Sequence, residues 1–99
     1  MLLEKLGWRV SACSGFEDAL DVVKKNMDDI AIVVCDIRLN GIDGFSTVES
    51  LHQEGLQVPV LYITGFASSS EQRLKPNENL LVKPFNLQQL EAALLELQV

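Results

Sequence analysis

Three short apolar runs punctuate the chain, and a polar residue directly follows each run. The runs cover residues 32–35, 60–63 and 80–82. Short apolar runs rich in β-branched residues and separated by helix-length segments predict buried parallel strands. The residues that follow them are Asp36, Thr64 and Lys83. Since the carboxyl ends of parallel strands share one edge of a sheet, we expect a carboxylate, a hydroxyl and an ammonium to lie together there.

Helical periodicity fills the segments between the predicted strands. Strands are expected at 9–14, 30–35, 59–63 and 80–82. The end of a helix is expected at 1–6, a second helix after the capping-box pair Ser14 and Glu17, a third at 45–54, and a last one after the pair Asn86 and Gln89. The 65–79 segment predicts at most a turn or two of helix. This strand–helix alternation predicts an α/β fold with right-handed crossovers and helices on both faces of the sheet.

Composition narrows the class of protein. The 99 residues suit a single domain, and 47% apolar with 22% charged residues is typical of a soluble globular chain. The net charge of −6 disfavours binding to nucleic acid or an anionic membrane. The chain has neither a basic leader nor an apolar stretch of the ~20 residues that span a bilayer. We therefore expect a cytoplasmic protein, in which Cys13 and Cys35 are reduced thiols.

Each of the three polar residues is ambiguous on its own. An Asp after a strand commonly forms a turn or caps a helix, Thr favours strands, and Lys at a strand end is usually solvated. Together they suit phosphoryl chemistry. The Asp36 carboxylate can attack phosphorus, the Lys83 ammonium can pair with a phosphoryl oxygen, and the Thr64 hydroxyl can bind the transferred group. Because the three residues are expected to lie together, we favour a phosphoryl-transfer site over three unrelated structural roles.

The pattern resembles the receiver domain of two-component response regulators. The matching residues are Asp36, the Asp43-Gly44 pair, Thr64, and Val82-Lys83-Pro84-Phe85. The resemblance implies a flavodoxin-like (CheY-like) parallel sheet flanked by helices, with Asp36 as the phosphoacceptor and Thr64 and Lys83 beside it. It also implies Mg²⁺ as cofactor, a histidine kinase or phosphotransfer protein as partner in a phosphorelay, and a cis peptide bond before Pro84. The short 65–79 segment looks most like the receivers of hybrid sensor kinases.

One departure from the receiver pattern concerns the start of the chain. Receivers open with a strand that ends in two acidic residues, whereas residues 1–6 match only the end of the following helix. We therefore expect residues 1–99 to form one receiver-like domain that lacks the first strand and most of the first helix. Only Asp36 and the backbone carbonyl of Arg38 would then remain as Mg²⁺ ligands. We expect impaired Mg²⁺ binding and phosphorylation, and self-association through the open sheet edge.

Two alternatives to a working phosphoacceptor stay open. The chain could be a degenerate receiver that acts without phosphorylation, as an interaction or dimerisation module. It could also be a small phosphatase with an aspartyl nucleophile, but such enzymes typically need a second Asp two residues on, where this chain has Arg38. We expect a signalling module that is not an enzyme.

Overall fold

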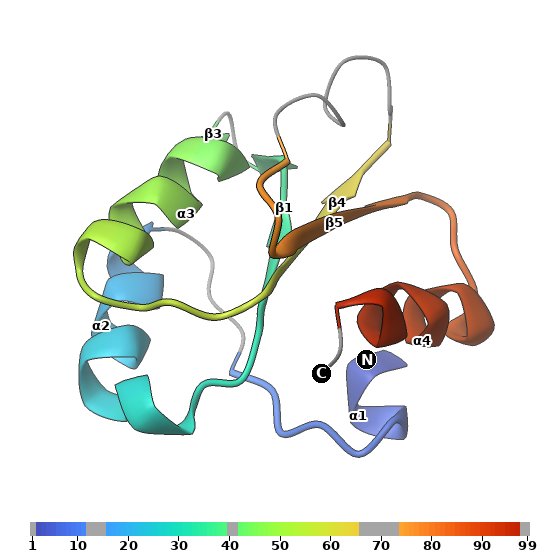
Figure 1. The fold of residues 1–99 in the computed structure, drawn as a ribbon, viewed down its shortest axis with the longest axis horizontal. Coiled ribbons are helices and arrows are strands. Elements are labelled where there is room, and N and C mark those ends of the chain that lie inside the picture. Colours follow the sequence, from blue (N-terminus) through green and yellow to red (C-terminus); the bar gives the residue numbers. More distant parts are fainter. Residues whose placement is uncertain (1, 12–15, 40–41, 66–73, 98–99) are drawn as a thin grey trace.

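A parallel sheet with helices on both sides forms the core of the computed structural model (Figure 1). The structure describes residues 2–11, 16–39, 42–65 and 74–97. The sheet has the order β1-β4-β5, and its strands are β1 (Val33–Asp36), β4 (Val60–Thr64) and β5 (Glu78–Val82). The helices are α1 (Leu2–Lys5), α2 (Phe16–Asn26), α3 (Gly44–Gln53) and α4 (Leu87–Glu96), with a 3₁₀ turn, η1 (Met27–Asp29), after α2. The predicted α/β fold with a parallel sheet is confirmed.

The strand register aligns the carboxyl ends of the three strands. Asp36 pairs with Ile63 across β1 and β4, and Thr64 pairs with Val82 across β4 and β5. Both pairs are the last of their ladders, so β1, β4 and β5 end at the same edge of the sheet. This is the edge at which an open parallel sheet binds ligands.

Two apolar layers hold the sheet between its helices. Figure 1 shows α2 and α3 on one side of the sheet and α1 and α4 on the other. Leu61 packs with Leu90 and Leu94 of α4, whereas Tyr62 packs with Phe45 of α3 at a ring-centroid distance of 4.4 Å. Successive residues of a strand point to opposite faces, so β4 supplies both layers and is the most buried strand.

The predicted capping box at the start of α4 is confirmed. The Asn86 side chain accepts a hydrogen bond from the Gln89 amide, and the Gln89 side chain accepts one from the Asn86 amide, both at 2.8 Å. These contacts satisfy two backbone donors that a helix start otherwise leaves unpaired. Leu90 and Leu94 of this helix are buried, as is Leu97, which caps its carboxyl end.

The strand expected at 9–14 is wrong over the part that the structure describes. Residues 9–11 belong to no strand, and residues 12–14 lie outside the described residues. A strand exists only where its backbone has a partner to pair with. In the described part of the chain, β1 pairs with β4 alone, and no strand lies along its other edge. Trp8 and Val10 instead pack their side chains against the layer of α1 and α4.

Other predicted boundaries move by one to three residues. The strand expected at 30–35 is β1, which begins later and includes Asp36, and the one expected at 80–82 is β5, which begins two residues earlier. The helix expected at 45–54 is α3, which begins and ends one residue earlier. Most of the weak 65–79 segment lies outside the described residues. A short antiparallel ladder that the sequence pattern did not predict follows Asp36, and it pairs β2 (Arg38–Leu39) with β3 (Ile42–Asp43).

Two remaining expectations concern the cysteines and membrane-spanning segments. Cys13 lies outside the described residues, and Cys35 forms no disulfide within the described part of the chain. None of the described helices is long and apolar enough to cross a membrane.

Candidate functional site

Asp36 closes β1 at the shared edge of the sheet. The next residue, Ile37, donates its amide hydrogen to the Ile63 carbonyl of β4 at 2.9 Å, which fixes the backbone just beyond the carboxylate. The Asp36 side chain is 22% exposed. It is therefore anchored on a rigid strand and still accessible from solvent.

Lys83 directly follows β5, and its side chain reaches Asp36 at the end of β1, two strands away. Its Nζ lies 2.5 Å from Asp36 Oδ2, although the two residues are 47 positions apart in the sequence. The Lys83 amide donates to the Thr64 carbonyl at 2.7 Å, so the end of β5 is tied to β4. The peptide bond between Lys83 and Pro84 is cis, as the resemblance implied. The expected meeting of carboxylate and ammonium is present in the structure.

Thr64 lies on the strand between these two residues. It is the last residue of β4, and its side chain is buried, with the residue 8% exposed. Because β4 is central, its end lies between Asp36 on β1 and Lys83 after β5. The three residues singled out from the sequence therefore converge at one edge.

Gly44 is a site residue that the pattern alone did not reveal. Its amide donates to the Ile37 carbonyl at 2.7 Å, and it is buried where α3 begins. A Cβ atom at this position would lie 2.6 Å from the Asp36 carbonyl oxygen. The local sequence predicts no more than an ordinary turn at Asp43-Gly44. The one available signal was the glycine's place in the receiver-like motif, and only the fold shows the close approach.

Two oxygen groups of the described residues are candidates for Mg²⁺ binding. Mg²⁺ demands near-octahedral oxygen coordination, with carboxylates, waters and phosphate oxygens as the usual ligands. The Asp36 carboxylate and the Arg38 carbonyl are the ligands expected from the sequence. Within the described ranges, no group of three His, Cys, Asp or Glu residues could hold a metal ion.

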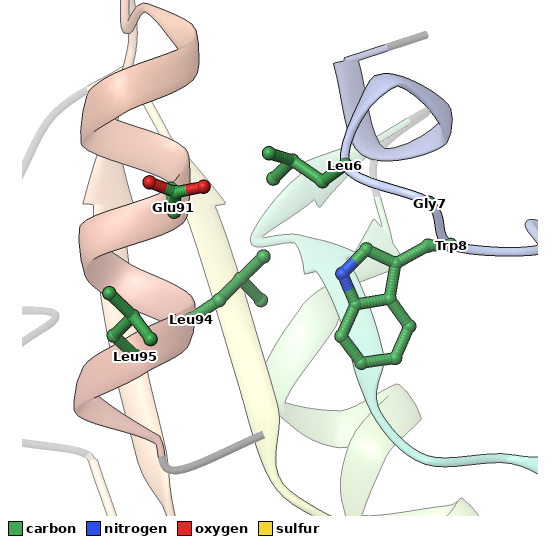
Figure 2. A pocket seen from close by; sticks show the side chains of 6 residues that line it. All are labelled: Leu6, Gly7, Trp8, Glu91, Leu94 and Leu95. Carbon is green, nitrogen blue, oxygen red and sulfur yellow. The ribbon is translucent and has the colours of Figure 1, made fainter.

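Two cavities lie away from this site. One, of about 420 Å³, lies between α4 and the segment after α1, where Figure 2 shows Leu6 and Trp8 across from Leu94. The other, of about 510 Å³, lies between α3 and β5 and includes Tyr62 and Glu78 in its lining. Asp36, Thr64 and Lys83 line neither cavity. At the site itself, the Lys83 side chain is 49% exposed and the Asp36 side chain 22% exposed.

Comparisons with known proteins agree on one family. Residues 1–95 match the profile of the response regulator receiver domain. The chain is 31% identical over 98 residues to the transcriptional regulatory protein ZraR of Klebsiella oxytoca, covering 96% of this chain and 22% of that protein. It is 33% identical over 95 residues to the sensor histidine kinase RcsC of Salmonella typhi, covering 93% of this chain and 10% of that protein.

Solved structures show the same fold. The chemotaxis protein CheY4 of Vibrio cholerae superposes with a TM-score of 0.84 at 22% identity, covering 97% of this chain and 82% of that one. A response regulator receiver protein of Sinorhizobium medicae superposes with a TM-score of 0.78 at 30% identity, covering 97% and 78%.

The chain therefore belongs to the response regulator receiver family and has its flavodoxin-like, CheY-like fold. Receiver domains are signalling modules of two-component systems, they interact with histidine kinases or phosphotransfer proteins, and they generally bind Mg²⁺ at an acidic pocket. The similarity to RcsC agrees with the resemblance to sensor-kinase receivers noted in the sequence. The chain spans about a fifth of the length of the ZraR proteins that it matches, at 21–22%.

Proposed function

We propose that this chain is a phosphoacceptor module in the cytoplasm, and that Asp36 takes a phosphoryl group from a histidine kinase or phosphotransfer protein. The observation that carries the proposal is the 2.5 Å approach of Lys83 Nζ to Asp36 Oδ2 at the shared strand edge. The chain acts in signalling and not as an enzyme. Its net charge of −6 argues against nucleic acid or an anionic membrane as partner.

The proposed transfer is a displacement at phosphorus. An Asp36 carboxylate oxygen attacks the phosphohistidine of the donor, so that an O–P bond forms while the N–P bond breaks. The imidazole nitrogen leaves with the bonding electron pair and takes a proton from water. The Lys83 ammonium, which is 49% exposed, can turn from the carboxylate towards a phosphoryl oxygen. The Thr64 hydroxyl supplies a neutral hydrogen-bond donor to the same group.

Metal binding by this chain is proposed to be weak. The two oxygens named above leave most of an octahedral shell to water, and the proposed phosphorylation is slow as a result. A titration with Mg²⁺, followed through the amide resonances of labelled protein, tests this point. We expect shifts near Asp36 that do not saturate at millimolar Mg²⁺. Saturable binding that disappears in Asp36→Asn would contradict the proposal.

Phosphorylation itself is tested with a small phosphodonor, phosphoramidate, in excess Mg²⁺. Intact-mass measurements should show one added phosphoryl group on the wild-type chain and none on Asp36→Asn. Asp29→Asn is the matched control, since Asp29 is exposed in η1 at the opposite, amino end of β1. Equal labelling of wild type and Asp36→Asn would show that the phosphoacceptor lies elsewhere.

A second candidate function is association through the edge of β1 along which no strand of the described residues lies, and the exposure of β1 favours it. All four residues of β1 are only half-buried, whereas β4 is almost wholly buried. The amides of Val33 and Ile37 point to β4, so the alternating Val34 peptide points away from it. An apolar strand edge of this kind is a template for pairing with a second copy. Light scattering after size exclusion should give a mass above the monomer's, and a monomer at every concentration would exclude this function.

A further inference from the structure

The carboxyl end of β1 lies between two backbone neighbours. On one side, Ile37 donates to the Ile63 carbonyl of β4 at 2.9 Å. On the other, the Ile37 carbonyl accepts from the Gly44 amide at 2.7 Å. Figure 1 shows the start of α3 beside this end of β1. The residue that follows Asp36 is therefore held from both sides.

The approach of Gly44 leaves no room for a side chain. A Cβ atom there would lie 2.6 Å from the Asp36 carbonyl oxygen, 2.9 Å from Ile37 Cα and 3.0 Å from Cys35 Sγ. Two of these three neighbours are backbone atoms of the strand that carries the carboxylate and of the residue that follows it. A flexible side chain could swing aside, but these backbone atoms move only if the strand end or α3 moves.

We propose that Gly44 is a positioning residue, whose missing side chain lets α3 and β4 together set where the Asp36 carboxylate lies relative to Lys83. The inference rests on the proposed function, because it concerns the site at which the phosphoryl group is taken up. Asp43, the residue before Gly44, pairs with Arg38 in the short β2–β3 ladder. We therefore expect a displaced Gly44 to move the Arg38 carbonyl as well.

The size of the required movement sets the expected effect. Ordinary contact with a Cβ atom begins at 3.4 Å, so the 2.6 Å gap to the Asp36 carbonyl must open by 0.8 Å. Since a misplacement of about 1 Å can cost ~10²-fold in rate, Gly44→Ala should slow phosphoryl uptake by roughly 10- to 100-fold. A substitution without close neighbours should leave the rate unchanged.

The experiment compares Gly44→Ala with Gly65→Ala in the 99-residue chain. A Cβ atom at Gly65 would have none of the described residues within 4 Å, so this glycine is the control for the same substitution. Phosphoramidate labelling is followed by intact mass, and the amide resonances of Asp36 and Lys83 are recorded for each variant. Gly44→Ala should lose labelling rate and shift both resonances, whereas Gly65→Ala should match wild type in both measurements. Equal rates and unshifted resonances in Gly44→Ala would overturn the inference.

Two further arms keep the result decisive. The double variant Cys35→Ala/Gly44→Ala removes the side-chain neighbour of the added methyl and leaves the two backbone neighbours in place. It should stay as slow as Gly44→Ala, and recovery of the wild-type rate would assign the effect to side-chain packing and overturn the inference. If Gly44→Ala is unfolded in buffer, the comparison is made in sucrose, which favours the folded state.

Failure of the proposed function would look different. If wild type and Asp36→Asn both take up no phosphate, the phosphoacceptor role fails, and the resonances alone then decide on Gly44. Shifts that reach Asp36 and Lys83 support the positioning role, and shifts confined to residues 43–45 overturn it.

Discussion

Lys83 Nζ lies 2.5 Å from Asp36 Oδ2, and the Lys83 amide is itself hydrogen-bonded to the Thr64 carbonyl at 2.7 Å. The backbone hydrogen bond to Thr64, at the end of β4, therefore helps to hold the Lys83 ammonium beside the carboxylate. Both side chains are partly exposed, and a pair of this kind contributes about 0–1 kcal/mol to stability. The contact is better suited to binding an incoming anion than to holding the fold.

Removal of the ammonium should affect phosphorylation more than stability. We expect Lys83→Ala to slow labelling of Asp36 by roughly 10- to 100-fold, the equivalent of a charge-assisted hydrogen bond of about 1.5–3 kcal/mol. Urea denaturation should show a change in unfolding free energy within about 1 kcal/mol. Lys75→Ala is the control, because Lys75 forms an exposed ion pair with Glu49 elsewhere on the molecule. A labelling rate in Lys83→Ala equal to that of the control would contradict the assigned role.

In the proposed function, the Thr64 hydroxyl donates a hydrogen bond to the phosphoryl group, so its removal should slow labelling. Thr64→Val keeps the shape and removes the donor, so labelling should slow by about 5-fold, as expected for a hydrogen bond from a neutral donor worth about 1 kcal/mol. Thr64→Ser keeps the hydroxyl and should label at close to the wild-type rate. If Ser and Val variants label equally slowly, the methyl group and not the hydroxyl is what the site requires.

The fold depends on the centre of β4. Leu61 is fully buried (0% exposed), and Leu61→Ala should lower the unfolding free energy by about 2–5 kcal/mol. Leu95 on α4 is 65% exposed, and Leu95→Ala should change the unfolding free energy by no more than about 0.5 kcal/mol. Urea denaturation of both variants measures the contrast. Similar losses in the two variants would mean that β4 is not the centre of the core.

The capping box at α4 gives a local test of helix stability. Asn86→Ala removes the acceptor for the Gln89 amide and should cost about 1 kcal/mol, whereas Asn86→Asp keeps an acceptor and should cost little. Thermal unfolding followed by circular dichroism compares the two variants. An Asp variant as unstable as the Ala variant would show that the cap contributes through something other than this hydrogen bond.

The sequence predicted the parts of the fold that local pattern determines. The apolar run before Thr64 is buried because β4 is the central strand. The capping box of α4 forms between Asn86 and Gln89, which lie within four residues of each other. The meeting of Asp36 with Lys83 followed from a general property of parallel sheets, that strand ends share an edge. These features needed no knowledge of distant contacts.

The sequence failed where the outcome depends on a partner far along the chain. Residues 9–11 have a suitable composition for a strand, but a strand forms only against another backbone, and β1 pairs with β4 alone within the described residues. The role of Gly44 is likewise a contact between elements. Nothing in the Asp43-Gly44 pair shows that α3 approaches β1 closely enough to exclude a methyl group.

The most direct test of the account locates the phosphoryl group on the chain. After labelling with phosphoramidate and Mg²⁺, borohydride reduces an aspartyl phosphate to homoserine, and tandem mass spectrometry of the peptides identifies the changed residue. The account predicts homoserine at position 36 in the wild-type chain and unchanged Asp36 in a sample without phosphodonor. Homoserine at another aspartate, with Asp36 intact, would contradict it.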